Sequence, residues 1–108
     1  MSKELKAWKN AISALGCIVC HQEGLGHTQP HLHHPRAGYG TADKASDWEV
    51  IPLCPIHHQY GDGTKKYQYQ VGYHYSPAEF VDRYGSEKYL LRRIYIQMGR
   101  PDLIIKYL

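Results

Sequence analysis

The sequence has no long hydrophobic run, and this absence excludes the simplest membrane proteins. A membrane-spanning helix needs about 18 or more consecutive apolar residues, and no segment of the 108-residue chain approaches that length. The first ten residues, MSKELKAWKN, are polar and charged, so they lack the apolar stretch of a signal peptide. We therefore expect a globular protein that has no membrane partner and acts in the cytoplasm.

The chain also has few cysteines and little excess charge. Its three cysteines are an odd number, and thiols stay reduced in the cytoplasm, so metal binding is a better interpretation than a disulfide framework. The formal net charge is only +3 with neutral histidines, which fits an anionic partner such as nucleic acid but does not require one. Histidine, in contrast, is abundant: five of the eight histidines fall between Cys20 and Arg36.

The length fits a single domain, 1–108, without internal repeats or low-complexity tracts. We expect an N-terminal helix within 1–16, a core with a bound ion over 17–75, and helices over 76–108. The stretch from Cys17 to Asp47 is rich in Gly, His, Pro and Thr and has no sustained periodicity. That composition favours loops and short strands shaped by something other than apolar packing.

Local patterns predict the individual elements. Ser2 and the apolar spacing after it predict a helix over 3–15. EVIPLC, residues 49–54, predicts a short strand, and one or two helical turns should begin at Pro55. These turns would follow the strand directly.

Two further helices are predicted near the C-terminal end. Ser76 followed by Pro77 and Glu79 is the capping-box pattern of a helix start. An apolar face then runs from Leu90 to Met98, before a Gly and a Pro that would stop the helix.

The most informative constellation is a pair of short knuckles, Cys17-Ile-Val-Cys20 and Cys54-Pro-Ile-His57. Structural zinc is held by four tetrahedral thiolate or imidazole ligands, and a two-residue gap lets both side chains of a knuckle reach one ion. We therefore predict a structural Zn²⁺ site made of Cys17, Cys20, Cys54 and His57. The alternative is that Cys17 and Cys20 are small buried hydrophobic residues.

The paired histidines predict a second site. Adjacent residues on a strand point to opposite faces, so His33 and His34 should have different roles. If His57 closes the zinc site, His58 lies about 100° further around the helix and can face another ion. Mg²⁺ or another divalent ion on a phosphate, with an imidazole as general base, is the chemistry that suits such a site.

Several short motifs resemble a known family. CIVCH, HHPR, IPLCPIHHQYG and YGSEKYLL occur in the order found in HNH nucleases, most closely the phage recombination-enhancement (Ref) nucleases. The resemblance spans about residues 17 to 92. It implies an α+β fold, namely a small ββα-metal (His-Me finger) HNH domain with structural zinc knuckles and flanking helices.

The resemblance also implies roles for individual residues. His33 would be a ligand of the catalytic metal, His34 the general base, and His58 the ligand on the helix. The third catalytic ligand would be His74, with Asp62 as the alternative.

One position departs from the family pattern. The middle asparagine of HNH, which orients the base, has no counterpart, because Asn10 is the only asparagine in the chain. The aligned residue is Glu49, and either Glu49, Asp47 or a backbone carbonyl would have to hold His34. Glu49 is also compatible with an ordinary solvated strand residue.

Basic residues near these motifs are candidates for DNA contact. Arg36 follows the predicted base, and Lys65 and Lys66 begin a stretch in which charge and tyrosine alternate. Surface or packing roles explain these residues equally well. The remaining histidines, His21, His27 and His31, are expected to be exposed loop residues.

The function implied by the resemblance is that of an endonuclease that hydrolyses DNA with Mg²⁺ or Mn²⁺. Ref nucleases depend on a RecA-type recombinase filament, so such a filament is an expected partner. The missing asparagine leaves two alternatives, a catalytically inactive zinc-stabilised DNA-binding module and a recombination adaptor.

Overall fold

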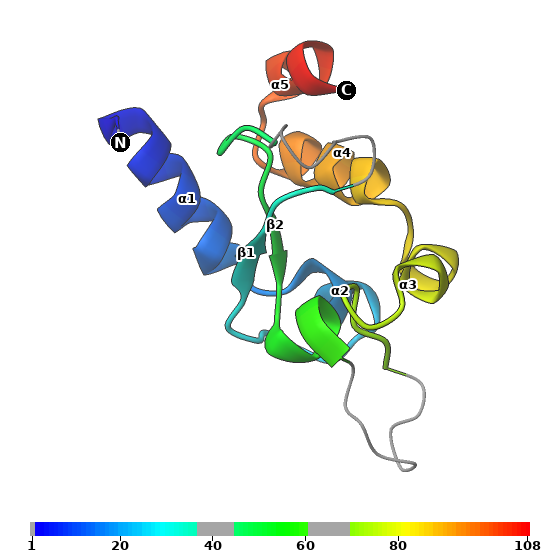
Figure 1. Ribbon diagram of the computed structural model, residues 1–108. Coiled ribbons are helices and arrows are strands. Elements are labelled where there is room, and N and C mark those ends of the chain that lie inside the picture. The colour runs from blue at the N-terminus through cyan, green and yellow to red at the C-terminus, as the bar shows by residue number, and fades with distance from the viewer. Residues whose placement is uncertain (1, 37–44, 61–69) are drawn as a thin grey trace.

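The computed structural model describes residues 2–36, 45–60 and 70–108. Figure 1 shows helices arranged around a small central pair of strands. In chain order the elements are α1 (Lys3–Leu15), α2 (Ile18–Gln22), β1 (His31–His33), β2 (Ile51–Leu53), the π-helical turn η1 (Ile56–Tyr60), α3 (Pro77–Tyr84), α4 (Glu87–Gln97) and α5 (Pro101–Tyr107). This mixture of helices with a small two-stranded sheet is compatible with the expected α+β class.

The two strands pair antiparallel, with His33 opposite Ile51 and Leu32 opposite Pro52. Proline is tolerated here because each strand of a two-stranded sheet has a free edge that needs no N–H donor. Burial rises along β1 from exposed His31 to His33, which is 2% exposed, whereas the side chain of His34 is 43% exposed. The predicted divergence of His33 and His34 is therefore confirmed.

Helix α1 begins and ends where the sequence predicted. The Ser2 hydroxyl accepts a hydrogen bond from Leu5 N at 3.1 Å, and the helix ends at Gly16, whose φ of 78° favours glycine. Trp8 and Ile12 are buried on one face, and α1 contacts both strands. Packing of this apolar face holds the helix against the sheet.

The stretch after α1 differs in part from expectation. The short strand β1 is confirmed, but residues 18–22 form helix α2 rather than a loop. Five residues are too few to show a helical period in the sequence. The local reason is a cap: Cys17 Sγ accepts a hydrogen bond from Cys20 N at 3.4 Å.

Helix α3 starts at Pro77 as expected, and α4 contains the predicted apolar face but begins earlier, at Glu87. The serine cap predicted for α3 is instead found at α4. The Ser86 hydroxyl accepts from Tyr89 N at 3.0 Å, whereas the Ser76 side chain makes no capping bond. The capping-box prediction for Ser76 was therefore wrong. Its φ of −145° sets it in the end of a turn, where its N–H donates to Gly72 O.

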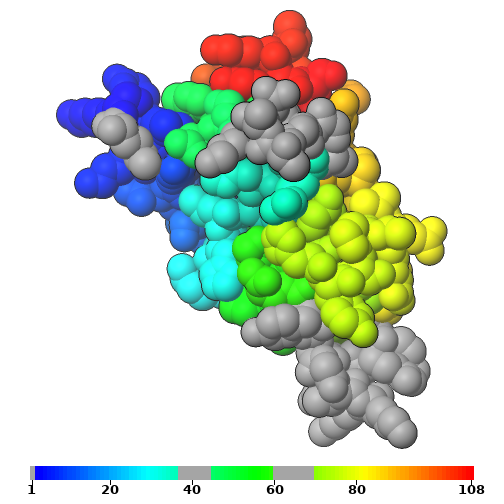
Figure 2. Space-filling model, viewed as in Figure 1, coloured from blue at the N-terminus to red at the C-terminus, as the bar shows by residue number. Residues whose placement is uncertain are grey.

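A single buried apolar cluster joins the helices to the hairpin. It includes Ile12 of α1, Ile51 of β2 and Leu91 of α4, and the Tyr95 hydroxyl of α4 donates to Trp48 O at 3.1 Å. Figure 2 shows the β1 segment (cyan) bordering the segment that follows residue 70 (yellow-green). None of the helices in the described part of the chain is long and apolar enough to cross a membrane.

Two candidate metal centres

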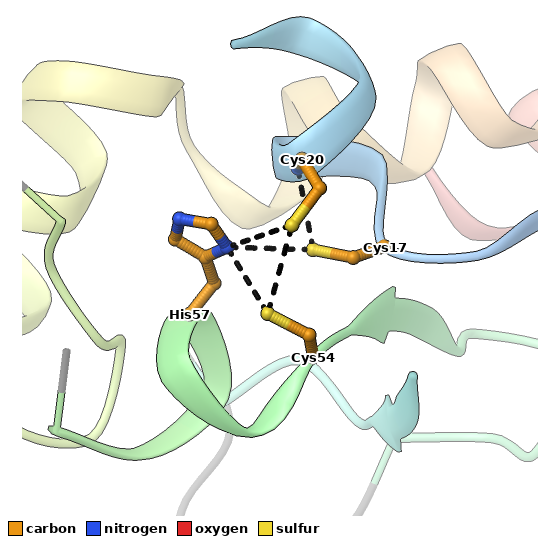
Figure 3. A group of neighbouring side chains, drawn as sticks. All are labelled: Cys17, Cys20, Cys54 and His57. Carbon is orange, nitrogen blue, oxygen red and sulfur yellow. Dashed lines mark hydrogen bonds between the residues drawn. The ribbon is translucent and has the colours of Figure 1, made fainter. Parts of the chain in front are cut away.

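The structure brings the two predicted knuckles together. Cys17 and Cys20 come from the start of α2, Cys54 follows β2, and His57 lies in η1 (Figure 3). His57 Nδ1 lies 3.5 Å from Cys17 Sγ, 3.5 Å from Cys20 Sγ and 3.3 Å from Cys54 Sγ. Cys20 Sγ and Cys54 Sγ are 3.7 Å apart, and all four residues are buried. We call this group the closed cluster.

These spacings fit a tetrahedral zinc ion. Metal–ligand distances of about 2.3 Å for sulfur and about 2.0 Å for nitrogen imply S···S edges of about 3.8 Å and S···N edges of about 3.5 Å. The measured values of 3.7 Å and 3.3–3.5 Å match those edges. The closed cluster can therefore bind a metal such as zinc.

A residue outside the knuckles sets the tautomer of His57. The His57 Nε2–H donates to Gln70 Oε1 at 2.5 Å, and the Tyr84 hydroxyl donates to the same oxygen at 3.4 Å. The amide oxygen is only an acceptor, so the proton of the neutral imidazole lies on Nε2. The lone pair of Nδ1 then faces the three sulfurs, as a metal ligand requires.

The thiols of the closed cluster interact strongly. The hydrogen bond from Cys17, followed by the contact with His57, lowers the pKa of Cys54 to about 3. The same Cys17–Cys54 bond raises the pKa of Cys17, and burial raises that of Cys20. Three buried thiols cannot all ionise close together unless a cation compensates their charge.

Three further histidines meet at a second group, which we call the open cluster. It consists of His33 from β1, His58 from η1 and His74 from the turn before α3, with one potential ligand atom from each lying within 4.8 Å of the others. Their ring centroids are 4.8–5.4 Å apart. His33 is buried, His58 is half-buried and His74 is exposed.

Backbone hydrogen bonds set His58 beside His74. The carbonyl oxygens of residues 57, 58 and 59 accept from the N–H groups of residues 73, 74 and 75, at 2.8, 3.1 and 2.7 Å. The last carbonyls of a helical turn have no partner within the turn, so they can accept such bonds. These bonds join η1 to residues 73–75, which follow it later in the chain.

Burial and repulsion between imidazoles favour the neutral forms of His58 and His74. Burial, then the neighbouring His33, His74 and His31, lowers the pKa of His58 from 6.5 to about 4. Burial and His33 also lower the pKa of His74, and the positive charge of Arg36 adds to this effect. Neutral imidazole is the form that binds a metal ion.

The predicted base has an acidic partner, but it is not the aligned residue. The His34 Nε2–H donates to Asp47 Oδ1 at 2.8 Å, and Lys9 Nζ lies 3.4 Å from Asp47 Oδ2. The hydrogen bond with His34 is the main cause of the lowered pKa of Asp47. Glu49 is buried instead, and its Oε1 accepts from Ser46 N at 3.0 Å. Of the alternatives that the sequence left open, the structure thus pairs His34 with Asp47.

Sequence reasoning missed two residues around the open cluster. His31, expected to be an exposed loop residue, is exposed but belongs to β1 and places its Nδ1 3.1 Å from His58 Nδ1. Glu87, at the start of α4, lies 2.6 Å from His33 Nε2 and is buried. No spacing in the sequence links Glu87 to His33, because 54 positions separate them.

The other predicted residues fall in different places. His21 and His27 are exposed and donate ring N–H groups to the last carbonyls of α1, Leu15 O at 2.8 Å and Ala14 O at 3.2 Å. Arg36 is exposed. The alternative ligand Asp62 and the predicted DNA contacts Lys65 and Lys66 lie outside the described residues.

The fold and the two clusters define a class of protein: a small α+β domain with two candidate metal centres, one closed and one open to solvent. The family model described as "Recombination enhancement, RecA-dependent nuclease" matches residues 2–99, and the chain belongs to this family. The resemblance to recombination-enhancement nucleases that the motifs indicated is confirmed. A comparison with curated proteins gave no match.

Proposed function

We propose that this protein is a metal-dependent HNH endonuclease that hydrolyses DNA during recombination. The observation that carries the proposal is the convergence of His33, His58 and His74 on one open cluster, with His34 adjacent in sequence and paired with Asp47. The family description independently indicates a nuclease that depends on RecA. A recombinase-coated DNA is accordingly the substrate that we propose, and cytoplasm is the proposed location.

The order of the elements supports an HNH interpretation of the fold. A hairpin, β1–β2, is followed by the helical turn η1, which is the order of a ββα-metal motif. His33 ends the first strand and His58 lies on the turn, so the hairpin and the turn each supply one residue of the open cluster. The closed cluster lies at the base of the same turn, where a zinc ion would hold η1 against α2.

The open cluster would hold the catalytic ion. His33, His58 and His74 would bind Mn²⁺ or Mg²⁺, and imidazole ligands favour Mn²⁺ over Mg²⁺. When bound, such an ion stabilises negative charge on the scissile phosphate and on the leaving 3′ oxygen. The exposed side chain of His74 leaves one side of the cluster accessible to a substrate.

His34 would act as the general base. Because its Nε2–H donates to Asp47, Nδ1 is the nitrogen left to accept a proton from the attacking water. The resulting hydroxide adds to phosphorus, the P–O3′ bond breaks, and the 3′ oxygen takes a proton from solvent. Asp47 would orient the ring, which is the role that asparagine has in relatives of the HNH type, and its negative charge would stabilise the imidazolium.

Positive charge next to the cluster would position the DNA backbone. Arg36 follows the base by two residues, is exposed, and lies close enough to His74 to affect its pKa. A guanidinium in that position can form paired hydrogen bonds with a phosphate. Lys65 and Lys66 stay in the proposal as additional phosphate contacts on the strength of the sequence alone.

A cleavage assay with His34→Ala tests the proposal. Loss of a general base lowers the rate of the chemical step by about 10²- to 10⁴-fold, whereas zinc content and Mn²⁺ affinity should stay at wild-type values. The matched control is His27→Ala, which removes an exposed histidine that has no contact with the open cluster.

The assay should include single-stranded, duplex and recombinase-coated DNA with Mg²⁺ and with Mn²⁺. Absence of wild-type cleavage on every substrate would refute the nuclease proposal. The inactive DNA-binding module or the recombination adaptor would then take its place.

A further inference from the structure

Glu87 is a buried carboxylate that contacts three segments around the open cluster. Its Oε2 lies 2.6 Å from His33 Nε2 and accepts a hydrogen bond from Arg36 N at 2.9 Å. Its Oε1 accepts from the Tyr73 hydroxyl at 2.9 Å. The residue is only 3% exposed. One side chain of α4 therefore reaches the end of β1, the backbone two residues beyond His34, and the residue before His74.

The surroundings of Glu87 suit an ionised carboxylate. Burying such a group is costly unless donors replace its water, and here ring, backbone and phenol donors do so. Glu87 is also the first residue of α4, where the helix dipole favours negative charge. Burial and the bond to Glu87 raise the pKa of Tyr73 to about 12, so its hydroxyl remains a donor.

The contact with Glu87 constrains His33 chemically. An ionised carboxylate only accepts hydrogen bonds, so the His33 nitrogen that faces it must carry a proton. The lone pair that His33 can offer to a metal is then on Nδ1. Histidine ligands commonly have a carboxylate on the opposite ring nitrogen, which fixes ring orientation and raises the basicity of the ligand atom.

We propose that Glu87 is a positioning residue that sets the tautomer and orientation of His33 and, through Tyr73, aligns His74 for a divalent metal ion. This inference rests on the proposed function, because the proposed function assigns a divalent ion to the open cluster. Glu87 lies within the motif YGSEKYLL, but neither the resemblance carried by that motif nor the family description gives the residue a role in the site. Glu87 itself is not within the group of mutually close ligand atoms, so it acts through His33.

Glu87→Gln tests the proposal with little change in side-chain shape. Its amide can donate to His33 and so permits the opposite tautomer. In protein whose closed cluster retains zinc, the affinity for Mn²⁺ alone, measured by calorimetry, should fall by about tenfold to a hundredfold. The matched control Glu79→Gln removes an exposed carboxylate that faces Arg83 on α3 and should leave Mn²⁺ affinity unchanged.

A spectroscopic measurement separates positioning from a loss of structure. Nitrogen-15 shifts of the metal-free wild type should show His33 protonated on Nε2 and unprotonated on Nδ1, and Glu87→Gln should increase the Nδ1–H form. If Glu87→Gln does not fold, Tyr73→Phe serves instead, since it removes a donor to Glu87 while keeping the ring. It should weaken Mn²⁺ binding by a smaller factor.

The two proposals fail in distinguishable ways. A wild-type His33 protonated on Nδ1, or unchanged Mn²⁺ affinity in folded Glu87→Gln, would overturn the role of Glu87 while leaving cleavage by the wild type intact. A wild type that binds no Mn²⁺ at the open cluster and cleaves no DNA would overturn both.

Discussion

The closed and open clusters use ligands from the same turn, η1, yet they differ in burial and in charge. Every residue of the closed cluster is buried, whereas the open cluster runs from buried His33 to exposed His74. Structural zinc sites are closed by four protein ligands, and catalytic sites keep a position for substrate or water. We therefore propose that the adjacent residues His57 and His58 serve different purposes, one structural and one catalytic.

The charges of the ligands reinforce this contrast. Three thiolates more than neutralise a divalent ion, so the closed cluster suits a buried ion that contacts nothing else. Three neutral imidazoles leave the full double charge on the ion. In the proposed function, an ion held by the open cluster would therefore attract a phosphate, and an ion held by the closed cluster would not.

Cys20→Ser is expected to have the largest effect, because it breaks the closed cluster. The substitution should release about one equivalent of zinc and unfold the protein, since the binding energy of structural zinc is also folding energy. Zinc content by mass spectrometry and far-ultraviolet circular dichroism measure both results. His74→Ala is the comparison. It removes one histidine of the open cluster, and the variant should retain both its zinc and its fold. Unchanged zinc content in Cys20→Ser would contradict the structural assignment.

Asp47→Ala should have an intermediate effect on the cleavage rate alone. Without its carboxylate, His34 loses the partner that fixes its tautomer, and the rate should fall by about tenfold to a hundredfold. Asp47→Asn keeps an acceptor oxygen and should be closer to the wild type. The control is Asp102→Ala, which breaks an exposed ion pair with Arg100. If Asp47→Ala and Asp102→Ala cleaved at the same rate while Glu49→Gln lost cleavage, Glu49 rather than Asp47 would be the partner of His34.

The smallest expected effect is a pH dependence of the free energy of unfolding when the open cluster holds no metal. The pKa of His58 is about 4 in the folded protein and 6.5 ordinarily, so the unfolded chain binds more protons between these values. The free energy of unfolding should therefore decrease as pH falls from about 6.5 towards 4. Urea unfolding of wild type and His58→Ala, both retaining zinc, measures this. The slope should be shallower in His58→Ala, and identical slopes would refute the assigned pKa.

Residues with a fixed local spacing could be predicted from the sequence. The two-residue gaps of Cys17–Cys20 and Cys54–His57 are a property of the ligand geometry, so the closed cluster was recognisable. The divergence of His33 and His34 followed from strand alternation. The helix over 3–15 was likewise predictable, because its cap and its apolar face are local.

Partners that meet only in the folded chain could not be predicted in this way. Asp47 rather than Glu49 faces His34, because the turn before β2 directs the Asp47 carboxylate outward. An alignment of positions does not show in which direction a side chain points. Glu87 of α4 reaches His33 of β1, and the position of His74 depends on backbone bonds to η1. Such contacts are set by tertiary packing.

Selective removal of the open-cluster ion tests the central claim most directly. Protein loaded with zinc and Mn²⁺ would be treated with citrate, a chelator too weak to compete for a buried thiolate site, and then assayed for bound metals and DNA cleavage. We predict that Mn²⁺ and cleavage are lost together, that one zinc equivalent and the fold remain, and that added Mn²⁺ restores cleavage. Cleavage that persists after the open cluster has lost its ion would contradict the account.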